Sequence, residues 1–341
     1  TDPAVAAPPS SGYGLQKLVR RNRLVFIAGG AVAIALVVGM STSTWLFLKE
    51  REAHKRALMA EQQQARLRLE AETREKITQA ALLVSQERFA EADALLGDIS
   101  LKQPTLEGAA VIRAVGEWHA LENRWREAAD RFSQLLEVDG LEGVDVVTLD
   151  YLRCGPALLE AGDQEAYRRF RNEAVSRFAR AISPFSDRIV KISLLRTADA
   201  TTLAALAPIV ADTARAYEEA EKTGDIFQAA WRAMAISLFE YRKGNYAAAI
   251  DWAERSMVAD QNASRTFAAN AIVAMARHEM GDPQRARADL LAMKELSENR
   301  LRTAINGGRG TPVQGFWFDY AFARILLREA SERLGVTLAD G

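Results

Sequence analysis

The sequence predicts an all-α protein: one long apolar helix, a charged helical segment, and then a stack of helix pairs closed by a last helix. Three observations support this prediction. Proline occurs only 9 times and glycine 21 times in 341 residues, which favours long helices over turn-rich β-structure. Residues 24–48 carry no charge. After residue 81, similar turn sequences recur between stretches whose apolar residues lie three and four positions apart, as in an amphipathic helix.

The composition excludes several classes of function. With 44 Lys and Arg against 45 Asp and Glu, the net charge is −1, so the chain is neither a strongly basic nucleic-acid binder nor an acidic tail protein. A single cysteine excludes an internal disulfide framework and a thiolate metal cluster. Because only three histidines accompany it, we expect no metal site, and we expect no cofactor. From the charge balance we expect no nucleic-acid partner.

Residues 1–16 combine Pro3, Pro8 and Pro9 with Ala, Ser and Gly, and have too little apolar area to offset the entropy of ordering. We therefore expect a flexible linker. Residue 1 is Thr rather than Met, and a linker that begins a chain links nothing. For this reason we expect the chain to be a piece of a longer polypeptide.

A basic flank and an uncharged segment of 25 residues (LVFIAGGAVAIALVVGMSTSTWLFL) make up residues 17–48. As a helix, the uncharged segment would be about 37 Å long, enough to cross a hydrocarbon core of about 30 Å. A cleaved signal peptide has an apolar region of only about 7–15 residues, and a core helix of this length rarely lacks charges. We predict a single membrane span through residues 24–48, with Trp45 at the interface of the lipid bilayer.

The orientation of this span does not follow from charge. The positive-inside rule compares the Lys and Arg residues on the two sides, and here each side has four. They are Lys17, Arg20, Arg21 and Arg23 before the span, and Lys49, Arg51, Lys55 and Arg56 after it.

Residues 49–80 consist mainly of strong helix formers, and no Gly or Pro occurs between Met40 and Leu96. We expect the membrane helix to continue as a charged rod of about 30 residues, roughly 45 Å long. A homodimeric coiled coil and a solvated single helix supported by i,i+4 ion pairs both fit this composition. The apolar positions are sparse for a heptad: Leu58, Ala65, Leu69 and Ile77.

The segment 81–300 repeats itself. Turn sequences occur at 87–92 (ERFAEA), 123–128 (NRWREA), 162–163 (GD), 244–249 (GNYAAA) and 281–283 (GDP). Arg88 and Arg124 are 36 residues apart, and Asn245 and Asp282 are 37 apart. The pattern resembles the tetratricopeptide repeat, a helix pair of about 34 residues. This resemblance implies a right-handed α-solenoid of about six helix pairs, each stacked on the next.

In that family a small residue of the first helix meets a small residue of the second. Three pairs twelve residues apart fit: Gly116 with Ala128, Ser237 with Ala249, and Ala274 with Ala286. Aromatic residues three positions before the second small residue should plug the turns; these are Phe89, Trp125 and Tyr246.

The middle of the chain departs from this pattern. The third unit has the bulky Tyr167 where a small residue is expected, although Gly155 fits. The fourth has a loose turn at residues 197–199 and carries Pro208 inside its second helix.

Residues 301–341 contain a Gly-rich loop (306–310), an aromatic helix (316–334) and a tail. The loop lacks the Gly-Lys-Ser/Thr ending of a phosphate-binding loop. We expect the aromatic helix to be a cap that seals the last helix pair, and not a ligand pocket, because a terminal repeat has an apolar face to cover.

No catalytic motif is present: the sequence has no Gly-x-Ser-x-Gly elbow, no Walker lysine and none of the protein-kinase signatures. We expect that this chain has no catalytic residue and is not an enzyme. Cys154 stands among apolar residues of a predicted first helix, which indicates a buried residue and not a reactive thiol. His119 takes a position at which the repeat usually has a packed tyrosine.

The first helices of a solenoid line its concave face, and we expect a protein or peptide partner to bind there. Exposed aromatic and arginine side chains are good anchors for a partner. The repeat phase places seven residues on this face: Arg113, Glu117, Trp231, Met234, Tyr241, Arg242 and His278.

Four segments are similar to bacterial serine/threonine protein kinases of the planctomycete and verrucomicrobial type. They are residues 43–53 (STWLFLKEREA), 75–83 (EKITQAALL), 117–121 (EWHAL) and 149–156 (LDYLRCGP). In that family a kinase domain precedes a linker, one membrane helix, a charged helical stretch and tetratricopeptide repeats. The resemblance covers residues 15–335 but not the kinase domain itself.

This resemblance implies that the chain is the non-catalytic, sensing part of a receptor whose parent polypeptide would be a kinase. A kinase needs cytoplasmic ATP, so a single span of the bacterial inner membrane would place the repeats on the outer side. The alternative is a stand-alone membrane scaffold that assembles complexes and sends no signal.

Overall fold

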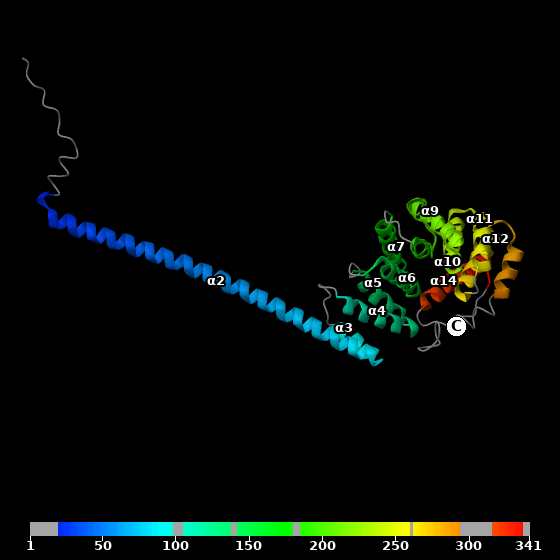
Figure 1. Cartoon of the computed structure of the whole chain (residues 1–341), viewed down its shortest axis with the longest axis horizontal. Coiled ribbons are helices and arrows are strands. Elements are labelled where there is room, and N and C mark those ends of the chain that lie inside the picture. Colours follow the sequence, from blue (N-terminus) through cyan, green and yellow to red (C-terminus); the bar gives the residue numbers. More distant parts are fainter. Residues whose placement is uncertain are drawn as a thin grey trace, which may run out of the picture. The chain divides into compact units, whose positions relative to one another are not determined.

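The computed structural model describes residues 20–97, 105–137, 142–179, 185–259, 262–293 and 316–336. All regular secondary structure in these residues is helical (Figure 1), which confirms the all-α prediction. The expected linker (1–16), the Gly-rich loop (306–310) and the tail after residue 336 lie outside the described residues. The chain divides into two compact units, Thr1–Glu72 and Thr73–Gly341.

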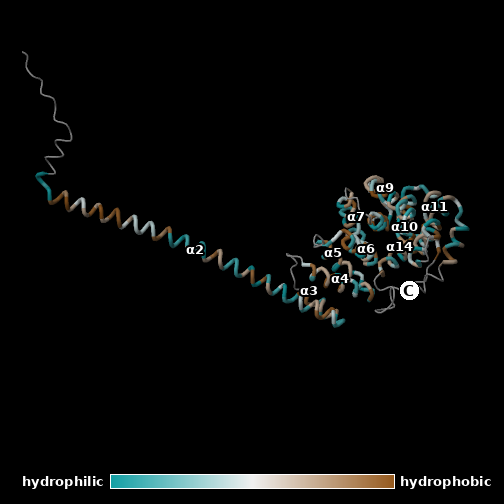
Figure 2. The backbone as a smooth tube through the Cα atoms, in the orientation of Figure 1, coloured by the Kyte–Doolittle hydropathy of each residue, from teal (hydrophilic) through white to brown (hydrophobic). Residues whose placement is uncertain are grey.

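The first unit is formed by most of α2, a helix of 63 residues that runs from Arg23 to Ser85. Within the described residues, α2 is the one helix long and apolar enough to cross a membrane, judged by length and composition. Its apolar stretch is fully exposed, and Figure 2 shows the change from apolar to charged residues along the helix. Gly29, Gly30 and Gly39 do not interrupt it.

The charged part of α2 carries ion pairs one turn apart. Arg56 pairs with Glu52 at 3.2 Å and Arg66 with Glu70 at 2.8 Å. Pairs of this spacing stabilise a solvated helix by about 0.2–0.5 kcal/mol each. They are the contacts that a single helix needs in order to persist in water.

The second unit begins with the last turns of α2, whose Ile77, Ala80 and Leu83 are buried. Successive helices then pack on their neighbours, and their apolar faces form one large core cluster. The helices are α3 (Phe89–Gly97), α4 (Leu106–Leu121), α5 (Trp125–Glu137), α6 (Val144–Glu160), α7 (Gln164–Phe178), α8 (Ser186–Ser193), α9 (Ala200–Thr223), α10 (Ile226–Lys243), α11 (Tyr246–Ala259), α12 (Ala263–Glu279), a helical segment over 283–293, and α14 (Trp317–Leu334).

One kind of turn recurs between helices: five times it joins the two helices of a pair, and once, between α9 and α10, it joins one pair to the next. A residue with positive φ ends the preceding helix, and the N–H of the next residue donates to the carbonyl five positions earlier. This is the pattern of a Schellman cap. At Glu87 and Asn123 the left-handed residue is not glycine, with φ of 60° and 57°. The bonds are Arg88 to Leu83, Arg124 to His119, Asp163 to Leu158, Asp225 to Ala220, Asn245 to Glu240 and Asp282 to Arg277, all 2.9–3.0 Å.

Five of these turns are the five predicted from the sequence, and their positions are confirmed. The sixth, Gly224–Asp225, joins α9 to α10 and was not predicted, although it has the same Gly-Asp signal as Gly162–Asp163. The loose turn at 197–199 is also present, because α8 ends at Ser193 and the Asp199 side chain caps α9 by accepting from the N–H of Thr202 at 2.7 Å.

One of the three predicted small-residue contacts, between Ser237 and Ala249, is seen as a hydrogen bond. The Ser237 hydroxyl donates to the carbonyl of Ala249 at 2.7 Å, so the backbones of α10 and α11 approach each other there. Tyr167, the bulky exception, is buried, and its hydroxyl donates to the carbonyl of Ile192 at 2.8 Å. A large residue fits at this position because its ring reaches the end of the short α8.

Gly116 gives a test of this packing. A methyl group added there would lie 2.8 Å from Cε1 of Phe132. Overpacking of this kind costs about 1–3 kcal/mol, so Gly116→Ala should lower the free energy of unfolding by that amount in chemical denaturation. Gly97→Ala, whose added methyl would meet nothing within 4 Å, is the control and should lose no stability. Equal behaviour of the two variants would contradict the close contact.

Candidate functional site

The seven predicted binding residues lie on α4, α10 and α12, each the first helix of its pair. Their exposure differs from the prediction. Trp231, Met234, Tyr241 and Arg242 are buried, so the expectation that they are exposed anchors for a partner is wrong. His278 is partly buried. Helix α14 covers part of this face, since its Glu329 pairs with Arg242 and its Arg333 lies over the Tyr241 ring. Trp231 is covered by Lys191 of α8 and Arg265 of α12.

Helix α14 packs against α12, as expected for a cap on the last pair, but it also packs against α6, far upstream in the sequence (Figure 1). Thirteen of its 18 residues are buried. A helix with this share of buried residues is packed on more than one side. The prediction of a terminal cap is therefore incomplete: α14 is an inner helix against which several pairs pack.

The aromatic cluster at the start of α14 belongs to this core, as the sequence predicted. Trp317 is fully buried, with its ring centroid 5.9 Å from Trp125 and 5.7 Å from Phe132 of α5. These are ordinary distances for packed aromatic rings. The cluster packs the start of α14 against α5.

A buried ion pair joins α14 to α10. The Arg242 guanidinium donates to both carboxylate oxygens of Glu329 at 2.5 and 2.6 Å, and its Nε donates to the carbonyl of Leu194 at 3.0 Å. The two side chains are only 2% and 7% exposed. Burial alone would raise the pKa of Glu329, but the hydrogen bonds and charge of Arg242 outweigh it, so the pKa lies below its usual value.

A second buried cluster joins α14 to α8. The Lys191 ammonium lies 4.0 Å from the Trp231 ring centroid, 3.9 Å from Oδ1 of Asp319 and 4.0 Å from Oδ2 of Asp187. Burial lowers the pKa of Lys191. Burial raises the pKa of Asp319 to about 6, against the attraction of Lys191. The sequence signal for this cluster is a lysine between two apolar residues, Val190 and Ile192, and no prediction was made from it.

The Asp319 carboxyl predicts a pH dependence of stability. Its pKa in the folded protein, about 6, is above the ordinary value of 3.8, so its contribution to stability is present below pH 4 and is lost as the pH rises through about 6. Between pH 4 and 7, Asp319→Asn should therefore become more stable relative to the natural chain by roughly 2–3 kcal/mol. Urea denaturation at a series of pH values measures this difference. A difference independent of pH would contradict the prediction.

Arg113 and Glu117 belong to an ion network between α4 and α6. Arg113 donates to both oxygens of Asp150 at 2.7 and 2.8 Å and pairs with Glu142. Arg153 donates to Glu117 at 2.7 Å and to Asp150 at 3.3 Å. The hydrogen bond to Asp150 raises the pKa of Arg113 in spite of burial. The network joins α4 to α6, the first helices of two consecutive pairs. Arg113 and Glu117 are therefore already paired within the protein, although the sequence predicted that they would contact a partner.

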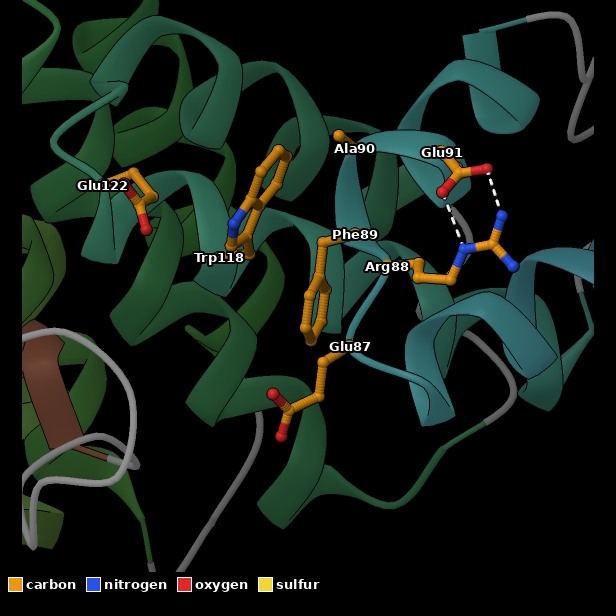
Figure 3. Close-up of a pocket in the computed structure, with 7 residues that line it drawn as sticks. All are labelled: Glu87, Arg88, Phe89, Ala90, Glu91, Trp118 and Glu122. Carbon is orange, nitrogen blue, oxygen red and sulfur yellow. Dashed lines mark hydrogen bonds and ion pairs between the residues drawn. The ribbon is translucent and has the colours of Figure 1, made fainter.

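Figure 3 shows a surface depression at the first turn. Phe89 stacks on Trp118 with 6.0 Å between ring centroids, which agrees with its predicted role as a plug of this turn. The Arg124 guanidinium lies 3.7 Å from the Trp118 ring centroid, and Arg88 pairs with Glu91. Phe89 and Trp118 pack this turn onto α4, and the rest of the lining consists of exposed residues, most of them charged.

The residues with potential chemistry are buried. Burial raises the pKa of the Cys154 thiol to about 12, so a negligible fraction is thiolate at neutral pH, as expected for a packed residue. His119 is buried 3.1 Å from Asp93, and burial lowers its pKa. Among the described residues, no group of three His, Cys, Asp or Glu side chains is placed to hold a metal ion.

Comparison with models of known protein families and with curated protein sequences gives no match. The fold and the buried clusters define the class: an all-α protein in which helix pairs pack against an inner C-terminal helix and one further helix has the length and composition of a membrane span.

Proposed function

We propose that the chain is a membrane-anchored helical-repeat module that binds a partner protein and forms the non-catalytic part of a receptor-type serine/threonine protein kinase. The observation that carries the anchor is the exposed, uncharged stretch 24–48 of α2. In water this stretch would expose a continuous apolar surface, which soluble proteins avoid. In the hydrocarbon core of a bilayer the same apolar side chains are removed from water, which lowers the free energy of the chain.

The binding module is supported by one turn type that recurs within the helix pairs, and from Glu87 to Asn123 and from Gly244 to Gly281 the interval is close to that of the tetratricopeptide repeat. We propose a right-handed solenoid, as that repeat family forms. Because α14 fills the face of the first helices, the partner would meet the surface made by the second helices of the pairs.

The kinase assignment rests on the resemblance of four segments to bacterial receptor kinases. It implies a kinase domain in the reading frame upstream of Thr1 and repeats on the outer side of the inner membrane. The rod would then transmit the state of the repeats across the bilayer. An upstream frame that begins just before Thr1 would instead favour the stand-alone scaffold.

Two arginines in the middle of the span test the anchor. Leu36→Arg with Val37→Arg should abolish insertion, because each arginine at the centre of a membrane helix costs about 2.5–3.5 kcal/mol. The measurement is the fraction of the chain that stays with membranes after alkaline extraction. Leu58→Arg with Met59→Arg, at two exposed apolar positions of the rod, is the matched control and should remain in the membrane fraction. If both variants left the membrane fraction, or if both remained in it, the proposed span would be contradicted.

A further inference from the structure

A groove of about 630 Å³ lies between α9 and α11, on the surface of the second helices. Both helices pack on α10, whose small residues Ala229 and Ala230 are buried beneath the groove and line it. Tyr217 of α9 lines one wall, with its ring 5.0 Å from Trp252 of α11. The volume is within the range of sites that accept several side chains of a ligand, about 300–1,000 Å³.

Large apolar side chains stand exposed at this groove. Val258 of α11 is 88% exposed and Ile226 of α10 is 55% exposed, and both line it. Phe227, the neighbour of Ile226 in the chain, is also exposed. A cluster of exposed apolar residues beside a hollow is typical of a surface that another molecule covers.

The charge of the groove is negative. Its lining contains the carboxylates Glu221, Asp251 and Glu254 and one cation, Arg255. Arg255 is already paired with Asp251 at 3.0 Å, and Glu221 accepts a hydrogen bond from the Tyr217 hydroxyl. Glu254 makes no ion pair with any described residue. A partner with positive charges around an apolar stripe would be complementary to this lining.

We propose that the α9–α11 groove binds an amphipathic helix of a partner protein, with two or three apolar anchors flanked by Lys or Arg. The proposal rests on the proposed function and names the chemistry of its partner. Docking of an apolar helix face into a groove between helices is a common mode of recognition, and strand addition needs a sheet edge, which the described residues do not provide. An anionic membrane surface would be repelled by the same carboxylates.

The test uses the full chain in nanodiscs of zwitterionic lipid and two stapled helical peptides. The peptides share one stripe of leucines and carry either Lys or Glu beside it. Fluorescence anisotropy should show binding of the Lys peptide and at least tenfold weaker binding of the Glu peptide, a difference of about 1.4 kcal/mol. Glu221→Gln with Glu254→Gln, and separately Val258→Ser, should each weaken the Lys peptide severalfold. Val144→Ser, at another exposed apolar residue, is the control.

Three results would overturn the proposal: no binding of the Lys peptide, equal binding of both peptides, or binding that Val258→Ser leaves unchanged. Binding of the Lys peptide to empty nanodiscs would show a lipid effect and count against the groove in the same way. If the chain forms a dimer and Val258→Ser dissociates it, the groove binds a second copy of the chain, which would overturn the proposal of a partner helix. The alkaline extraction test does not depend on these results, so a failure of the groove leaves the membrane anchor intact.

Discussion

Glu329→Ala should lower the free energy of unfolding of the helical-repeat unit by about 3–5 kcal/mol, because it leaves the Arg242 guanidinium buried without its charge partner. The pair is almost fully enclosed, so water cannot replace the lost carboxylate. The ion pair also joins α14 to α10 and, through Arg242, to the end of α8. Its loss therefore weakens the packing of α14 against these helices. Chemical denaturation of the full chain in detergent, followed by tryptophan fluorescence, measures the effect.

Two further variants separate this effect from general damage. Glu91→Ala removes an exposed carboxylate that pairs with Arg88 on the surface, and it should cost far less than Glu329→Ala because water screens a surface pair. Arg242→Met with Glu329→Leu replaces the buried pair by apolar groups of similar size and should be nearly neutral. If Glu329→Ala were as mild as Glu91→Ala, the buried pair would not fasten α14.

Trp317→Ala should cost about 3–5 kcal/mol, since it removes the largest fully buried side chain of the described residues and leaves a cavity between α14 and α5. The neighbouring residue provides a matched control. Phe316 is 56% exposed, so Phe316→Ala should change the free energy of unfolding by less than about 1 kcal/mol. The same denaturation experiment compares the two variants, and an equal loss would show that the indole is not the contact that holds α14.

The turns between helices were predictable because their signals are local. A Gly-Asp or Asn-Arg step lies between two amphipathic stretches, and both the left-handed residue and the following hydrogen bond involve only neighbours in sequence. The uncharged stretch of α2 is likewise recognised from residues that are neighbours in the sequence. Periodicity in one chain therefore identifies which segments are helices and where most of them end.

The place of α14 was not predictable in this way. Its partners, such as Arg242 and Trp125, are 87 and 192 residues from Glu329 and Trp317, and nothing in the local sequence specifies such contacts. For the same reason Trp231, Tyr241 and Arg242 were expected on an open face. Their types suit a binding surface and a buried cluster alike, and only the packing of α8, α12 and α14 around them distinguishes the two.

The most direct test of the account is a pair of single-cysteine variants on the two sides of the proposed span. Cys154 can stay, because burial keeps its thiol protonated and enclosed. Ser10→Cys and Met280→Cys each add one thiol, and Met280 is exposed. In spheroplasts, an impermeant thiol reagent should label Met280→Cys at once and Ser10→Cys only after lysis. Labelling of both variants before lysis, or protection of both, would show that residues 24–48 do not cross the bilayer.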